Sequence, residues 1–362
     1  MSPTCYHLGM LRRRCERAGL LTLVLALLGG CPVCPDPLYE ITAETPAVRL
    51  PLDESVHCFG GAEWWYYTGR LVAGDGRSFG VETVIFHAPR FPYAVITEVW
   101  FAHFAILDER TGEFTYDQCV RLDPSPDATQ PGPGFQLSTR LVSFEGRDGR
   151  DRITAEMSDG RYSLALSLQD TREPILHGGD GYVPYGATGS SFYYSRPRMN
   201  AAGTLAVGGE VLDVSGRFWF DRQWGLDLRN PLQPWDWFSI RLDDGTDIML
   251  FRFPGRDEPV ALGTLVPATG EPQHLGAVDF SITPTATWTS PATGIEYDVG
   301  WEVAIPAADL LLSVTAVAEN QEFDARSSTL NAYWEGLCDV EGLEGGSEIS
   351  GHAFIEQANG GA

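Results

Sequence analysis

The chain has 362 residues, with 25 arginines, no lysine and 49 acidic residues, so its formal net charge is −24. The missing lysine excludes Schiff-base catalysis, a phosphate-loop lysine and a lysine general base. The acid excess argues against a nucleic-acid partner, because phosphate binding needs a basic patch. Aromatic residues at 11%, with 40 glycines and 24 prolines, favour short strands and many turns.

The first thirty residues have the pattern of a bacterial secretion signal. Four arginines between positions 12 and 17 precede an apolar stretch over residues 18–28. That stretch is too short to cross a bilayer as a helix. It ends in Leu-Gly-Gly-Cys at Cys31, which resembles the lipobox where a bacterial lipoprotein is cleaved and lipidated. An ordinary secretory signal or a buried apolar segment is the alternative interpretation.

We therefore expect a signal peptide over residues 1–30, a lipid on Cys31 and a proline-rich tether over residues 31–51. The lipid, and not a basic face, would attach this acidic chain to a membrane. Residue 32 is proline and not aspartate, so nothing signals inner-membrane retention. We expect a bacterial cell-envelope protein of the outer membrane, facing the periplasm or the cell surface.

Four cysteines remain after the predicted lipidation site in what would be an oxidising compartment. They allow three disulfide pairings, and unpaired buried thiols are equally compatible with the sequence. These residues are Cys34, Cys58, Cys119 and Cys338.

The remainder of the chain is predicted to be strands. A β-hairpin is predicted for residues 64–72 and 79–87, which are joined by a Gly-Asp-Gly turn. Residues 93–107 continue as an apolar strand, and the loops 121–134 and 178–189 follow. No helical period of useful length is present. The later predicted strands cover residues 162–168, 211–220, 235–242, 248–253, 297–305 and 310–318.

Two aromatic segments indicate an internal duplication. Residues 64–71 (WWYYTGRL) match residues 235–242 (WDWFSIRL) at an offset of 171, and both enter an Asp-Gly turn. Chance is the alternative, since aromatic strands resemble one another. One repeat of this length indicates two similar β-domains. We place them at residues 52–204 and 205–358, with a glycine-rich boundary near residues 201–209.

The sequence contains no metal-ligand spacing such as HExxH and no GxSxG elbow. We expect neither a metal nor a cofactor. The remaining candidates are carboxylates inside aromatic strands, where desolvation raises the pKa and keeps a proton available. Such an acid could protonate an alkene while aromatic rings face the cation. The catalytic candidates are Asp221, Asp236 and Glu63, with Glu335 in a similar setting; the alternative is pairing with Arg70, Arg217, Arg222 or Arg241.

Five segments together resemble the AttH/CrtC family of lipocalin-like proteins, which includes carotenoid 1,2-hydratase (hydroxyneurosporene synthase). The resemblance spans most of the chain after the signal. It implies two lipocalin-like antiparallel β-barrel domains and an apolar pocket in or between them. The matching segments are residues 63–69, 191–197, 221–225, 235–239 with 244–245, and 333–336.

The resemblance implies an apolar partner, isoprenoid- or lipid-like, bound by Trp64, Tyr66, Tyr194, Trp224, Trp237 and Trp334. We therefore interpret the protein as an envelope lipoprotein that binds such a ligand. One alternative is an enzyme, a hydratase, cyclase or isomerase, that works by acid-catalysed carbocation chemistry. Another alternative is a structural envelope protein.

One position departs from the family pattern. The family's Asp-His-x-Trp-Gly segment here contains Arg222 in place of histidine. Arginine stays protonated, so it cannot shuttle a proton, and a neighbouring arginine lowers a carboxyl pKa. In an extended strand, however, Asp221 and Arg222 point to opposite faces. Asp221 can therefore act without touching Arg222.

Overall fold

The structure is a computed structural model that describes residues 48–57, 61–88, 99–121, 133–186, 189–228, 234–253 and 260–358. The predicted signal peptide, Cys31, Cys34, Cys58 and almost all of the predicted tether lie outside these residues. The described chain is nearly all β, with short 3-10 turns such as η1 (Leu52–Glu54) and η3 (Pro306–Ala308). None of its helices is long and apolar enough to span a bilayer. The predicted all-β antiparallel fold is confirmed.

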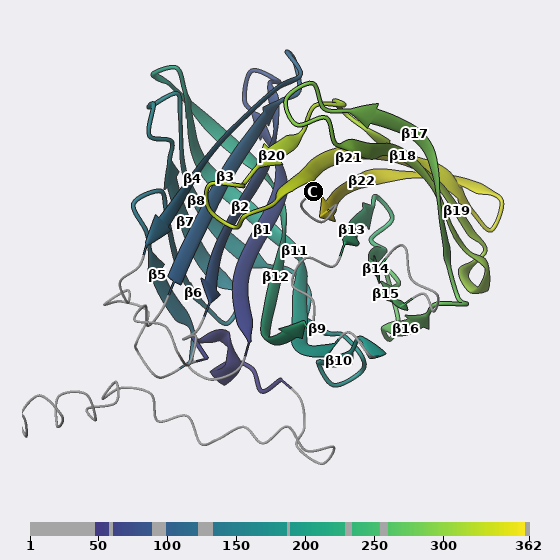
Figure 1. The fold of residues 1–362 in the computed structure, drawn as a ribbon. Coiled ribbons are helices and arrows are strands. Elements are labelled where there is room, and N and C mark those ends of the chain that lie inside the picture. Colours follow the sequence, from purple (N-terminus) through teal and green to yellow (C-terminus); the bar gives the residue numbers. More distant parts are fainter. Residues whose placement is uncertain are drawn as a thin grey trace, which may run out of the picture. The chain divides into compact units, whose positions relative to one another are not determined.

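Twelve described strands form the first sheet, which curls on itself (Figure 1). Its order is β4-β3-β2-β1-β12-β11-β8-β7-β6-β5, and β9 and β10 pair with β11. The strands are β1 (Ala62–Ala73), β2 (Ser78–Ala88), β3 (Val99–Asp108), β4 (Glu113–Arg121), β5 (Phe135–Ser138), β6 (Val142–Arg147), β7 (Arg150–Glu156), β8 (Tyr162–Asp170), β9 (Ile175–Leu176), β10 (Tyr182–Pro184), β11 (Gly189–Val207) and β12 (Glu210–Leu228).

The second sheet has ten described strands in the order β16-β15-β14-β13-β22-β21-β19-β18-β17, with β20 paired to β21. The strands are β13 (Trp235–Leu242), β14 (Asp247–Phe253), β15 (Val260–Val266), β16 (Gln273–Gly276), β17 (Ser281–Thr289), β18 (Glu296–Ile305), β19 (Leu310–Ala316), β20 (Glu322–Asp324), β21 (Ala332–Glu344) and β22 (Ser347–Ala358).

The two sheets repeat one topology, as the predicted duplication requires. In each sheet the first strand, β1 or β13, pairs with the second strand on one side and with the last strand on the other. The matching Asp-Gly turns also share their chemistry. The Asp75 carboxylate accepts from the backbone N–H of Arg77 at 3.0 Å, and Asp244 accepts from Thr246 at 2.8 Å. These side chains fix the turn that starts each repeat.

Two details differ from the sequence prediction. The predicted boundary at 204/205 lies inside the β11–β12 hairpin, where Val207 pairs with Glu210, and the chain passes from the first sheet to the second between Leu228 and Trp235. In addition, β10 lies in a stretch predicted to be loop, because Tyr182–Pro184 pairs with β11. The glycine-rich residues near the predicted boundary form the tight turn of the β11–β12 hairpin and not a linker between domains.

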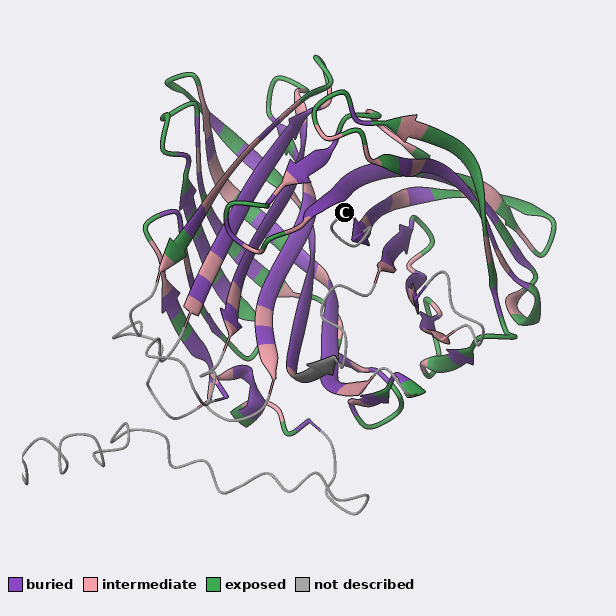
Figure 2. Cartoon of the chain, viewed as in Figure 1, coloured by how far each residue is buried: buried purple, intermediate pink, exposed green. Residues whose placement is uncertain are grey.

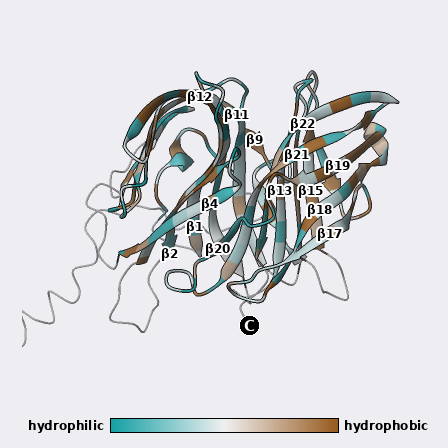
Figure 3. Ribbon diagram, turned by 90° about the horizontal axis from the view of Figure 1, so that it is seen from above, coloured by the Kyte–Doolittle hydropathy of each residue, from teal (hydrophilic) through white to brown (hydrophobic). Residues whose placement is uncertain are grey.

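Alternation along the strands gives each sheet two apolar faces. Buried residues follow the strands and exposed residues gather at the hairpin turns (Figure 2). Trp65 and Tyr67 of β1 face the core of the first sheet, whereas Trp301 and Trp334 belong to the core of the second. A third cluster unites residues of both sheets, including Tyr66 and Trp237. Figure 3 colours these strands by hydropathy. We call this third cluster the intersheet face.

Candidate functional site

Strand register places acidic residues beside an aromatic pair on the intersheet face. Tyr66 lies directly opposite Asp221 across β1 and β12, and Trp237 lies opposite Glu356 across β13 and β22. Because residues 66 and 237 are the same position in the two repeats, Asp221 and Glu356 are also equivalent. The rings of Tyr66 and Trp237 meet edge to face, with centroids 5.4 Å apart. Each repeat therefore contributes one carboxyl group next to this ring pair.

Asp221 is buried and is held by neutral hydrogen-bond donors. Its Oδ2 accepts from the Tyr193 hydroxyl at 2.5 Å, and its Oδ1 accepts from Trp219 Nε1 at 2.6 Å and from the Ser195 hydroxyl. Among the described residues, no arginine pairs with it. Burial raises its pKa to about 7, although the bonds from Ser195, Tyr193 and Trp219 act in the opposite direction. Trp237 Nε1 donates to the Tyr193 hydroxyl at 2.8 Å, which links both sheets to this carboxyl.

Arg222 faces the opposite side of β12, as the alternation predicts. It forms an ion pair with Glu63 at 2.5 Å inside the first sheet, and its guanidinium lies 3.8 Å from the Trp65 ring centroid. Burial would raise the pKa of Glu63, but Arg222 and the bonds from His57 and His87 hold it far below its ordinary value. Glu63 is thus ionised and is a poor candidate for a general acid. The arginine that departs from the family pattern is part of a buried ion pair.

Asp236 also has a cationic partner. Arg252 Nε donates to its Oδ2 at 2.6 Å across the β13–β14 pair. Burial raises the pKa of Asp236, and Arg252 opposes that effect. Of the three catalytic candidates, only Asp221 combines burial with the lack of an arginine among the described residues.

The predicted ligand-binding aromatic residues divide between three places. Trp64, Tyr66 and Trp237 share the intersheet face. Tyr194 and Trp224 pack in the core of the first sheet, where their rings lie 6.3 Å apart. Trp334 packs against Trp301 in the core of the second sheet. The first three therefore accompany Asp221, and the other three serve as core.

The structure groups Glu335, which the sequence analysis named beside the catalytic candidates, with two glutamates that it did not name, Glu82 and Glu356. Glu82 of β2, and Glu335 and Glu356 of β21 and β22, interact electrostatically with one another and with Tyr66. Both Glu335 carboxyl oxygens lack a hydrogen-bond partner of regular geometry among the described residues, as does the Tyr66 hydroxyl. The sequence feature that could have identified Glu82 is an acidic residue within a mostly apolar predicted strand, Val-Glu-Thr-Val at residues 81–84.

Burial raises the pKa values of all three glutamates. The pKa of Glu82 is about 8 and that of Glu356 is about 7, while the pKa of Glu335 lies well above its ordinary value. Mutual repulsion adds to this effect, because Glu356 raises the pKa of both Glu82 and Glu335. Like-charged carboxyls in one site cannot all ionise. The intersheet face therefore retains protons near neutral pH.

This face has an accessible edge. Trp64, Phe86, Trp235 and Phe251 are only partly buried although they pack against it. Glu356 is also half-buried. Aromatic rings beside protonated carboxyls can take up an apolar molecule, protonate it and stabilise a cation.

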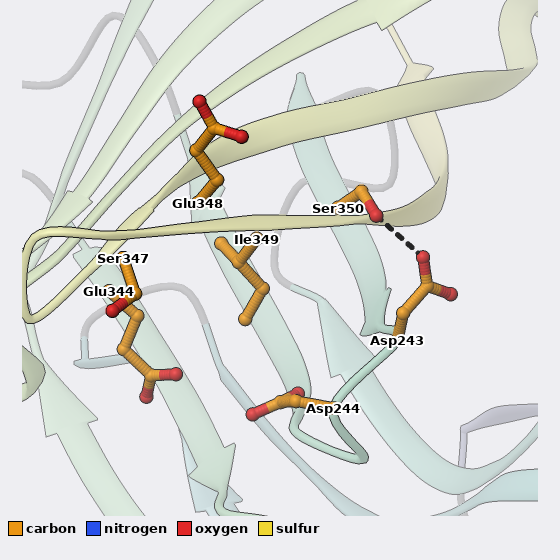
Figure 4. A pocket seen from close by; sticks show the side chains of 7 residues that line it. All are labelled: Asp243, Asp244, Glu344, Ser347, Glu348, Ile349 and Ser350. Carbon is orange, nitrogen blue, oxygen red and sulfur yellow. Dashed lines mark hydrogen bonds between the residues drawn. The ribbon is translucent and has the colours of Figure 1, made fainter.

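A separate surface pocket of about 330 Å³ shares none of these residues (Figure 4). It is lined by the acidic residues Asp243, Asp244, Glu344 and Glu348, with Ser347, Ile349 and Ser350. The Ser350 hydroxyl donates to Asp243 at 2.7 Å. It contains no aromatic ring, so it does not resemble a site for an apolar ligand.

The cysteines of the described chain are unpaired. Cys119 and Cys338 are buried and form no disulfide. Burial raises the pKa of the Cys338 thiol, so this residue behaves as part of the core and not as a nucleophile.

Comparisons with known proteins agree with this architecture. A crystal structure of an AttH protein from Nitrosomonas europaea superposes with a TM-score of 0.79 at 27% identity, covering 89% of this chain and 99% of the other. Kievitone hydratase from Nectria haematococca has the same fold, with a TM-score of 0.70 at 19% identity over 88% of this chain and 94% of the hydratase.

Sequence comparison gives a related result. The dehydratase asqC of Emericella nidulans is 25% identical over 225 residues, which cover 59% of this chain and 63% of the dehydratase, less than two thirds of its length. The AttH-like family matches residues 41–359. The chain therefore belongs to the AttH-like family, as its motifs indicate.

Proposed function

We propose that this protein is an enzyme that adds water to, or removes water from, an apolar isoprenoid-like substrate at the intersheet face. The observation that carries the proposal is Asp221, a buried carboxyl with a pKa of about 7 and neutral partners. The similarity to a protein named a hydratase and to another named a dehydratase supports the same class of reaction. The enzyme interpretation therefore has better support than simple ligand binding.

The hydrogen bonds indicate how the proton leaves Asp221. In the neutral acid Oδ1 still accepts from Ser195 and Trp219, so the proton resides on Oδ2. The hydrogen bond between Oδ2 and the Tyr193 hydroxyl is then reversed: Oδ2 donates, and the Tyr193 proton is free to point elsewhere. As Asp221 gives this proton to Tyr193, Tyr193 gives its own proton to a substrate carbon. The Asp221 O–H and Tyr193 O–H bonds break, and a Tyr193 O–H and a C–H bond form.

The rest of the cycle uses the surrounding rings and carboxyls. Tyr66 and Trp237 face the resulting carbocation, which their ring electrons stabilise. Water then attacks the cation, and a carboxylate of the same face takes up the released proton. Dehydration follows the same path in reverse, so one site serves both directions.

A mass-spectrometric screen tests this proposal. Purified protein is incubated with apolar alkenes and tertiary alcohols, and the products are examined for gain or loss of the mass of one water. We expect D221N to lower turnover by roughly 100- to 10,000-fold, the usual contribution of a general acid. The matched control is D213N, which changes an exposed aspartate of the same strand. Equal turnover in D221N and wild type would overturn the role of Asp221.

The same variants separate an enzyme from a carrier. A carrier would bind an apolar ligand equally well with and without the Asp221 proton, and it would return the ligand unchanged. The enzyme changes the ligand, and D221N retains binding while losing conversion. Release of unaltered ligand by the wild type, with the whole screen negative, would favour the carrier.

We also propose that the protein is anchored to the bacterial envelope through a lipid on Cys31. The Leu-Gly-Gly-Cys segment after a short apolar stretch supports this proposal. An alkyne fatty acid fed to cells that express the full chain should label the wild type and not C31S. Labelling of C31S at the same level would contradict the proposal.

A further inference from the structure

Five side chains form a continuous hydrogen-bonded chain from the edge of β4 to the buried glutamates. Gln118 Oε1 and the Ser328 Oγ are 2.6 Å apart, and Ser328 Oγ and His103 Nε2 are 2.8 Å apart. His103 Nδ1 lies 2.8 Å from the Tyr333 hydroxyl, which lies 3.0 Å from Glu82 Oε1. Gln118 is half-buried, whereas His103 and Glu82 are buried. The chain thus connects an accessible edge with the intersheet face.

The direction of these hydrogen bonds follows from one end. Gln118 Nε2 donates to the Asp324 carbonyl at 2.8 Å, so the Gln118 oxygen is the atom that faces Ser328. The hydroxyl of Ser328 has two acceptors in reach, the Gln118 oxygen at 2.6 Å and the Ala325 carbonyl at 3.2 Å, so its single proton is donated to these and not to His103. Ser328 can then only accept from His103, so His103 carries its proton on Nε2.

The other end is fixed by the same count of protons. Burial lowers the pKa of His103 to about 3, so the imidazole is neutral and its Nδ1 is a bare acceptor. Tyr333 must donate its only proton to that nitrogen. The oxygen of Glu82 that faces the Tyr333 hydroxyl must then donate to it, which requires a protonated carboxyl.

We propose that Glu82 holds a proton in the resting protein and that Tyr333 and His103 form a relay which can carry this proton from the intersheet face to His103 Nδ1. The step is balanced. The Glu82 O–H bond breaks as a new Tyr333 O–H bond forms, and the former Tyr333 proton forms an N–H bond on His103 Nδ1. The product is a carboxylate and an imidazolium with the same total number of protons.

The surroundings of the relay decide which state is populated. Three rings, those of Phe86, Phe323 and Tyr333, pack against His103 and bring no charge to it. Glu82 is faced by Glu356 of β22 and by Tyr333, and it interacts with Glu335 of β21 and Tyr66 of β1. The neutral state therefore dominates at rest. The imidazolium forms only transiently, as a proton passes.

The use of the relay rests on the proposed hydro-lyase function. In each turnover the intersheet face gives one proton to the substrate and takes one up from the attacking water, and the relay offers His103 as a temporary acceptor for the proton of Glu82 during this cycle. Tyr333 and His103 are positioning residues in this account, because they act through Glu82. They affect the reaction only by influencing which carboxyls of the intersheet face are protonated.

The tautomer of His103 is the direct test. Nitrogen-15 NMR of the full chain, labelled at histidine and assigned with H103Q, distinguishes Nε2–H, Nδ1–H and imidazolium without any substrate. We expect a neutral Nε2–H ring from pH 5 to pH 8. E82Q should retain it, because a glutamine amide donates to Tyr333 as the protonated acid does. An Nδ1–H or imidazolium ring in the resting wild type would overturn the relay.

A second pair of variants tests the link through Tyr333. Y333F removes the donor to His103 Nδ1 and should move the Nδ1 resonance. The matched control Y116F removes a hydroxyl from a ring that packs against the same Phe323, with centroids 4.3 Å apart, and should leave His103 unchanged. Equal spectra for Y333F and wild type would overturn the link. A protein with the expected tautomer but no turnover would contradict the hydro-lyase proposal and leave the resting relay intact.

Discussion

The D221N variant offers a test of the buried acid that needs no substrate. The pKa of Asp221 rises from an ordinary 3.8 to about 7 in the folded protein. Between these values the folded state binds a proton that the unfolded state has released. Stability therefore falls as the pH rises from about 4 to about 7, and it changes little above that.

The magnitude follows from the two pKa values. The difference between a pKa of 3.8 in the unfolded chain and about 7 in the folded protein corresponds to roughly 4 kcal/mol of lost stability once the pH exceeds both values. Roughly 2 to 3 kcal/mol of this loss falls between pH 5 and pH 8. Asp221 is only 3% exposed, so solvent screens this effect little. D221N cannot ionise, and it also removes a charge that raises the pKa of Glu335 and Glu356.

Urea unfolding at several pH values between 5 and 8 measures this difference. The wild type should lose stability over this range by roughly 2 to 3 kcal/mol more than D221N does. The control D213N should follow the wild type, since residue 213 is exposed in the same strand. If D221N and wild type show the same dependence on pH, then Asp221 is ionised throughout and the proton-donor argument fails.

Two other variants probe the remaining charged residues of the strands. R222M leaves Glu63 buried without its guanidinium partner and should lower the free energy of unfolding in urea by roughly 3–5 kcal/mol. The control R77M removes an arginine from an exposed ion pair and should change the free energy of unfolding little. An equally small effect of R222M would show that the buried pair is not needed for stability. E335Q removes a carboxyl group whose pKa lies well above its ordinary value, so the variant should be more stable than the wild type at pH 8 and exceed it by less at pH 5. An equal difference in stability at both pH values would mean that Glu335 is charged at both.

The fold could be predicted because its signals are local. Alternating apolar residues and Asp-Gly turns determine strands and hairpins over about ten residues. The aromatic repeat at residues 64 and 235 indicated the duplication, and the repeated strand order agrees with it. The boundary was misplaced because a glycine-rich hairpin turn and a glycine-rich linker have the same composition.

The site could be predicted only in part, because it depends on pairing between distant strands. The alternation of side chains between the two faces of a strand correctly predicted that Asp221 and Arg222 point to opposite faces of β12. It could not show that Arg252 would reach Asp236, since that contact depends on the β13–β14 register. Glu82 and Glu356 come from different sheets, and nothing within either strand indicates that they meet. Their electrostatic interaction is a property of the tertiary fold.

Infrared spectroscopy of protonated carboxyl groups tests the central claim most directly, which is that Asp221 holds a proton near neutral pH. The carbonyl stretch of a neutral carboxylic acid is separate from the amide bands and shifts in D2O. At pH 6 the wild type should show one contribution that D221N lacks and D213N retains, and it should fade as the pH passes about 7. Identical carboxylic-acid bands in wild type and D221N at pH 6 would show that Asp221 is already ionised and would contradict the account.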